Sequence, residues 1–170
     1  PVNEEEELRQ RILRRFDAFC EDYERRIRDL GGIGFFLGGI GPDGHVAFNI
    51  RGTSHFSTTR LDLLNYESQA AASSDLGGID GLRRKAVLTI GLGTITCRRD
   101  ATAIILAAGE AKATVVADAI ENPPGILNPA SCLQSLPNAR FYLTAGSSSR
   151  LKARRMAALL AAGPAARPRD

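Results

Sequence analysis

This sequence of 170 residues lacks the features that would place it in a membrane or in the secretory pathway. It has no apolar run approaching the roughly 18 residues that a transmembrane helix needs, so no membrane span is predicted. Residues 1–30 are charged throughout, and no apolar segment follows a basic start, so we expect no signal peptide. These absences favour a cytoplasmic protein without a membrane partner.

Cysteine is scarce as well. Cys20, Cys97 and Cys132 are odd in number and lie far apart, without the short spacings of zinc ligands. The pattern argues against a disulfide framework and against a metal site, and it favours a reducing compartment. We therefore expect three small thiols, buried or half buried, with no metal and no cofactor.

The C-terminal end is basic but lacks aromatic side chains between its basic residues. Nucleic-acid sites of this kind usually interleave the two, so no nucleic-acid partner is expected. Overall, 44% hydrophobic and 24% charged residues are typical of a globular protein. We predict one α/β domain over residues 1–160 and a flexible basic tail over residues 161–170.

Apolar periodicity predicts a long amphipathic helix over residues 4–30, ended by Gly31 and Gly32. Continuous apolar runs predict buried strands near residues 33–38, 86–91, 103–108 and 140–144, three of which end in glycine-rich segments. Helices are expected after the third and fourth runs. This alternation favours a parallel, Rossmann-like sheet with helices on both faces and ligands at the carboxyl ends of the strands. Because all four runs are apolar, we expect another chain, as in a homo-oligomer, to cover a sheet edge.

The first of these strand exits carries chemistry-bearing residues. Asp43 and His45 lie two apart around Gly44, so an extended backbone places both side chains on one side. A carboxylate there can orient an imidazole, whose pKa suits proton transfer near neutral pH. The spacing alone leaves open a turn-capping Asp beside a packed His.

The segment Gly38-Gly39-Ile40-Gly41-Pro42-Asp43-Gly44-His45-Val46-Ala47-Phe48-Asn49 resembles the motif of the glucosamine-6-phosphate deaminase/isomerase family, to which 6-phosphogluconolactonases are related. Further similar segments follow in the family's order, and the resemblance covers roughly residues 16–155. They are Thr53-Ser54 to Thr59-Arg60, Leu88 to Thr94, Gly109 to Ala113 and Ser131 to Gln134. The resemblance implies a fold of the sugar-phosphate isomerase and CoA-transferase type.

The resemblance also implies roles. Asp43 and His45 would assist opening of the sugar ring before isomerisation and loss of ammonia, and Lys112 would hold the phosphate of a sugar-phosphate substrate. Gly39, Gly41 and Thr94 would line the same cleft, and Arg60 would belong to an effector or subunit contact. We therefore expect Asp43, His45, Thr94 and Lys112 to converge.

Three departures from the family motif qualify this expectation. Ile50 stands where the family has a glutamate of the proton relay, and Ser74 where it has a phosphate-binding arginine. The family's N-terminal βα region, which carries its general base, has no counterpart in this sequence. We expect the chain alone to be inactive as a deaminase. A non-catalytic sugar-phosphate-binding relative and a 6-phosphogluconolactonase-like hydrolase stay open as alternatives.

Overall fold

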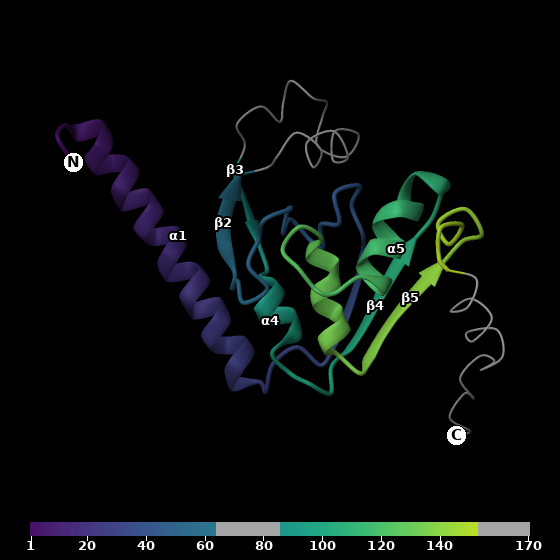
Figure 1. The fold of residues 1–170 in the computed structure, drawn as a ribbon. Helices are drawn as coiled ribbons and strands as arrows, with labels where there is room; N and C mark the ends of the chain where they lie inside the picture. Colours follow the sequence, from purple (N-terminus) through teal and green to yellow (C-terminus); the bar gives the residue numbers. More distant parts are fainter. Residues whose placement is uncertain (64–85, 153–170) are drawn as a thin grey trace.

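The computed structural model describes residues 1–63 and 86–152 (Figure 1). A parallel sheet in the order β1-β4-β5 forms its centre, and β2 and β3 pair separately as an antiparallel ribbon. The strands are β1 (Phe35–Gly39), β2 (Arg60–Leu63), β3 (Ala86–Thr89), β4 (Thr102–Ala107) and β5 (Asn138–Leu143). The helices are α1 (Glu4–Asp29), α4 (Leu92–Thr96) and α5 (Ala113–Glu121), with 3₁₀ turns η1 (Glu110–Lys112) and η2 (Pro129–Ser135).

The long N-terminal helix has well-formed ends. The side chain of Asn3 accepts a hydrogen bond from the backbone N–H of Glu6, which satisfies a donor that the first turn leaves free. At the other end, Gly31 and Gly32 adopt φ angles of 86° and 87°, a conformation that costs glycine little. The predicted helix over residues 4–30 and its glycine stop are confirmed.

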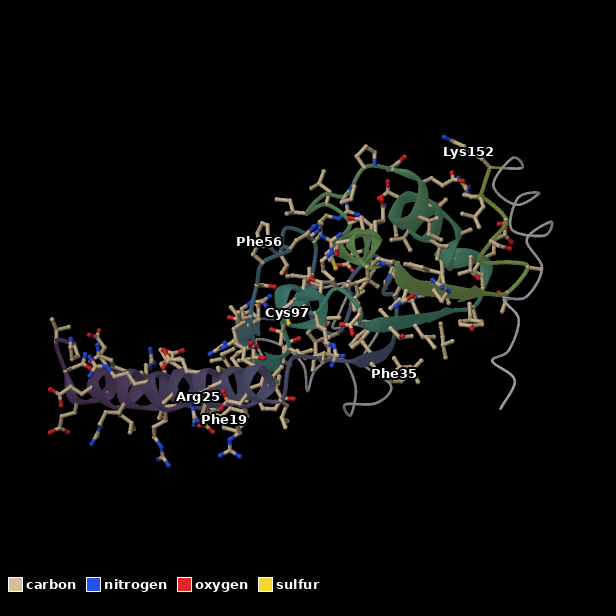
Figure 2. The ribbon with its side chains drawn as sticks, turned by 90° about the horizontal axis from the view of Figure 1, so that it is seen from below. Phe19, Arg25, Phe35, Phe56, Cys97 and Lys152 are labelled. Atoms are coloured by element: carbon tan, nitrogen blue, oxygen red, sulfur yellow. The ribbon has the colours of Figure 1, made fainter. Side chains whose placement is uncertain are left out.

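One face of the parallel sheet is covered and the other is not, within the described residues. Ala103, Ile105 and Ala107 of β4 are buried beneath α4, α5 and η2. The opposite face stays exposed, and Figure 2 shows Phe35 pointing away from the body. Its large side chains include Phe35 (60% exposed), Leu37 (56%), Leu106 (53%) and Tyr142 (59%). The α/β class with a parallel sheet is confirmed, but the described helices cover one face rather than both.

The predicted strand near residues 86–91 lies in a different sheet from the one expected. Residues Ala86–Thr89 form β3, which pairs antiparallel with β2, with Arg60 opposite Thr89 and Leu63 opposite Ala86. The chain then enters α4 at Leu92, and a Cβ at Gly91 would lie 2.1 Å from the carbonyl oxygen of Ser57, so the backbone packs closely there. An apolar run indicates burial but not which strand it pairs with, so the prediction of four strands in one parallel sheet was wrong for this run.

The expected final helix beyond Leu151 and the position of Ser74 lie outside the described residues. Among the helices that the structure describes, none is long and apolar enough to cross a membrane. Residues 161–170, predicted as a basic tail, also fall outside this part of the chain, so that expectation stays a prediction.

Candidate functional site

The loop that follows β1 places an aspartate and a histidine in direct contact. His45 Nδ1 lies 2.6 Å from Asp43 Oδ1, and the His45 backbone N–H donates to the same oxygen at 3.3 Å. Since an ionised carboxylate only accepts hydrogen bonds, the imidazole donates from Nδ1. Asp43 is buried, whereas 13% of the His45 side chain stays accessible. The buried Asp43 therefore orients the ring, and part of the imidazole stays accessible to solvent.

Two glycines shape this loop. A Cβ at Gly41 would lie 2.0 Å from Cε1 of His45, so the imidazole rests directly on the backbone at that position. Gly44 has a φ of 87°, and a Cβ there would meet the side chain of Asn128 at 2.4 Å. The turn is closed by Gly41 N–H donating to the His45 carbonyl at 2.9 Å. The absence of a side chain at Gly41 therefore lets the imidazole of His45 pack against the backbone, and a substrate contact of Gly41 stays a prediction.

Lys112 reaches this loop from the end of β4. Its Nζ donates to the carbonyl of Ile40 at 2.5 Å, across 72 residues of sequence. Burial lowers the pKa of Lys112 from its ordinary value, and the nearby Asp43 carboxylate partly opposes that shift. The structure thus brings Lys112 against the loop that carries Asp43 and His45, at the carboxyl ends of β1 and β4.

A cavity of about 590 Å³ opens beside this loop. Pro42 and Arg51 line it from the loop, α5 contributes Asp118, and Arg150 contributes from beyond β5. The Arg51 backbone N–H donates to Asp43 Oδ2 at 3.4 Å, which fixes this wall to the buried aspartate. The cavity therefore adjoins the loop, but the residues that line it include neither Asp43, His45 nor Lys112, and Asp118 and Glu121 accompany the two arginines.

Thr94 does not join the cluster with its side chain. Its hydroxyl donates to Glu24 Oε1 of α1 at 2.6 Å, and Thr59 donates to the same atom from its backbone N–H at 2.7 Å and its hydroxyl at 2.6 Å. Glu24 and Thr94 line a separate cavity of about 720 Å³ that includes neither Asp43, His45 nor Lys112. Of the four residues expected to converge, Asp43, His45 and Lys112 lie around one loop, whereas the Thr94 hydroxyl is hydrogen-bonded to α1.

The buried carboxylate of Glu24 is the feature that sequence reasoning missed. Burial alone raises its pKa, but the hydrogen bonds from Thr59 and Thr94 outweigh this and lower the pKa below its ordinary value. Within the helix pattern, Glu24 looked like an ordinary charged surface residue. The only available signal was its position between Cys20 and Ile27, which are also buried.

Arg60, the expected effector or subunit contact, has partners within the chain. Its guanidinium donates to Asp62 at 2.6 Å and to Asn49 Oδ1 at 2.9 Å, and Asn49 in turn donates to the Ile90 carbonyl at 2.8 Å. These bonds connect β2 to the buried end of the site loop. An effector role for Arg60 stays a prediction.

Two further positions that the sequence singled out are Gly39 and Ile50. Gly39 ends β1 opposite Leu106, and a Cβ there would meet the Leu106 carbonyl at 3.7 Å, which is an ordinary contact. Ile50 follows the buried Asn49 and offers no titratable group. Within residues 1–63 and 86–152, no group of three or more His, Cys, Asp or Glu residues is placed to hold a metal ion.

Comparison with known proteins shows which proteins this chain is similar to. A scan against protein-family models found no match. The chain is 36% identical over 136 residues to a glucosamine-6-phosphate deaminase of Cronobacter sakazakii, covering 80% of this chain and 50% of the relative. It is 40% identical over 124 residues to glucosamine-6-phosphate deaminase 2 of Xenopus tropicalis, covering 73% and 44%. The chain spans about half the length of these relatives.

Solved structures agree with the curated relatives. A monomeric glucosamine-6-phosphate deaminase superposes with a TM-score of 0.72 at 31% identity, over 78% of this chain and 54% of that one. A 6-phosphogluconolactonase from Trypanosoma brucei superposes with a TM-score of 0.59 at 18% identity, over 81% and 54%, and this likeness shows the fold alone. The chain is therefore similar in sequence and in fold to glucosamine-6-phosphate deaminases, of which it spans about half the length.

Proposed function

We propose that this site binds an amino-sugar phosphate and takes part in converting glucosamine 6-phosphate to fructose 6-phosphate and ammonia. One observation carries the proposal. The buried Asp43 orients His45 at 2.6 Å, and the Lys112 side chain is held against the same loop by its 2.5 Å bond to the Ile40 carbonyl. A proton-transfer pair and a cation for the phosphate thus lie together, as a sugar-phosphate enzyme requires.

Ring opening is the step that the Asp43–His45 pair suits. With Nδ1–H donated to Asp43, the basic lone pair of a neutral imidazole is on Nε2. His45 would accept the proton of the sugar's C1 hydroxyl as the bond between C1 and the ring oxygen breaks, and would return that proton to the ring oxygen. No net proton is consumed, and Asp43 stabilises the imidazolium that forms in between.

Lys112 suits the phosphate end of the substrate. It lies in η1, immediately before α5, where the positive end of the helix dipole adds to its charge. Its half-buried position strengthens a charge-assisted hydrogen bond relative to one at an open surface. The adjoining cavity is lined by Arg51 and Arg150 together with the acidic Asp118 and Glu121.

The activity that we expect of these 170 residues alone depends on Ile50 and on the length of the chain compared with its relatives. An isoleucine cannot exchange a proton with His45, and the relatives are about twice as long as the matched region. We therefore expect binding without efficient turnover, with a dissociation constant on the order of 1 mM for glucosamine 6-phosphate.

A coupled ammonia-release assay and calorimetric titration with glucosamine 6-phosphate test this proposal together. Binding that is lost in both His45→Gln and Lys112→Met, with ammonia release below about 1 s⁻¹, is the expected result. Undiminished binding in both variants would contradict the assignment of the site.

Ile50 favours one second candidate, a sugar-phosphate-binding protein without catalysis. That candidate has the same ligand and differs only in turnover. It is distinguished by Ile50→Glu, which restores a carboxylate beside the pair. A gain in ammonia release in this variant supports an enzyme whose relay is interrupted and excludes a purely binding role.

A further inference from the structure

Helix α1 carries an apolar stripe that the rest of the described chain leaves open. The stripe consists of Leu8, Ile12, Phe16, Phe19 and Tyr23, which are between 36% and 55% exposed. Their spacing of four, four, three and four residues keeps them on one side of a nearly straight helix. In both views the N-terminal part of α1 extends away from the body (Figures 1 and 2).

The helix is held to the body by the neighbouring side of its C-terminal half. Cys20, Glu24 and Ile27 are buried there, and Glu24 bonds to Thr59 and Thr94. This anchoring fixes the orientation of the stripe, which borders a groove of about 390 Å³ lined by Ile12, Arg15, Phe16, Phe19 and Leu88. Rigid exposed apolar surface of this kind marks an interaction site.

The charges at the two ends of α1 indicate what occupies the stripe. Its first turn is acidic, with Glu4 to Glu7, and its last turn is basic, with Arg26 and Arg28. A second copy laid antiparallel brings each acidic end beside the basic end of the other, whereas a parallel copy sets like charges together. We propose that two copies of this chain pair through α1 in antiparallel orientation.

The stripe is self-complementary in that orientation. When Leu8 lies opposite Tyr23 of the second copy, Ile12 lies opposite Phe19, and the two Phe16 side chains meet near the two-fold axis. The N-terminal half of α1 extends away from the body, which leaves this part of the helix accessible to a second copy (Figure 2). Arg25 and Arg26 already pair with Asp22 within the helix. Exposed charges contribute little binding free energy. We therefore expect the charges to determine the orientation of the two helices, and the apolar stripe to provide the affinity of the pair.

Sedimentation equilibrium on the 170-residue chain tests the pairing. We expect a dimer at micromolar concentrations, weakened about 100-fold or more by Ile12→Glu, which places a charge in the middle of the stripe. Gln10→Glu is the matched control, because it adds the same charge to an exposed position on the far side of the same helix. Circular dichroism should show equal helix content in both variants. A chain that is monomeric at every concentration, or a dimer that Ile12→Glu leaves intact, overturns the proposal.

Disulfide trapping tests the orientation. In a Cys97→Ser background, which removes the exposed thiol, Leu8→Cys/Tyr23→Cys should form cross-linked dimers and each single variant should not. Identical positions are separated by about 22 Å along antiparallel helices in this register, at 1.5 Å per residue. Efficient cross-linking of either single variant would indicate a parallel or shifted pair and would refute the arrangement.

Discussion

Nδ1 of His45 lies 2.6 Å from Oδ1 of Asp43, and this contact fixes which imidazole nitrogen carries the proton. If Asp43 sets the tautomer, Asp43→Ala should shift neutral His45 from the Nδ1–H form toward the Nε2–H form that model imidazoles prefer. Long-range ¹H–¹⁵N correlation spectra of the histidine ring report this directly. His45→Gln removes the signal and so confirms its assignment, and an unchanged tautomer in Asp43→Ala would show that another group orients the ring.

Gly41 tests how closely the loop must pack on the imidazole. In Gly41→Ala the new methyl would lie 2.0 Å from His45 Cε1, so the ring must move and its bond to Asp43 must weaken. We expect sugar-phosphate binding to fall about 10-fold or more, as expected when a charge-assisted hydrogen bond is lost. Gly34→Ala is the control, since its nearest contact is the end of the Arg98 side chain at 3.5 Å. Equal binding by both variants would contradict the packing argument.

Lys112→Met should weaken binding of glucosamine 6-phosphate about 10- to 100-fold, the range expected for one charge-assisted phosphate contact. Binding of glucosamine, which lacks the phosphate, should not change. Lys152→Met removes an exposed lysine instead and serves as control. Calorimetric titration distinguishes these cases, and a loss that is equal for glucosamine would show a structural role for Lys112.

The lowered pKa of Lys112 predicts that phosphate affinity and folding stability both depend on pH. Its pKa lies below the ordinary 10.5 because burial disfavours the charged form, with Asp43 opposing in part. Phosphate affinity should therefore decline as pH rises toward 10.5, at lower pH than an ordinary lysine would cause. In the same window the unfolded chain binds more protons than the folded one, so the contribution of Lys112 to folding stability rises with pH. Both trends should be absent in Lys112→Met.

Glu24 should matter for stability rather than for ligand binding. Glu24→Ala leaves Thr59 and Thr94 without their acceptor, which costs about 2–4 kcal/mol in the free energy of unfolding. Because hydrogen bonds lower the Glu24 pKa despite its burial, its stabilising contribution is present above the ordinary pKa and is lost as pH falls through the folded-state value. Denaturant unfolding of Glu24→Gln and wild type should therefore converge at acid pH. A constant difference across pH would exclude an ionised Glu24.

The parts of the fold with strong local signals could be predicted from sequence. The period of Leu8 to Ile27 and the two glycines specified α1, and the apolar runs at β1, β4 and β5 specified the parallel strands. The pairing of β3 with β2 could not be predicted, because β2 is a segment of only four residues, Arg60–Leu63, and its short polar–apolar alternation is a weak strand signal. Pairing depends on contacts between distant segments, which local patterns do not encode.

The residues of the candidate site also differ in whether the sequence could indicate them. The spacing of Asp43 and His45 at a strand exit indicated a candidate pair, whereas Lys112 was singled out only by the family resemblance; parallel strands then bring the two strand exits to one edge. Thr94 also follows a strand, but β3 belongs to the other sheet, so its hydroxyl meets α1 instead. The bond between Glu24 and Thr59, 35 residues apart, had no local pattern to indicate it.

The two histidines of this chain allow the central claim to be measured in one titration. His45 lies on the proposed sugar-phosphate loop, whereas His55 lines the separate cavity beside Glu24. Adding glucosamine 6-phosphate to ¹⁵N-histidine-labelled chain should shift the ring signals of His45 in a saturable way and leave those of His55 unchanged. Signals of His45 that do not move at millimolar ligand, or that move no more than those of His55, would contradict the assignment of this loop as the sugar-phosphate site.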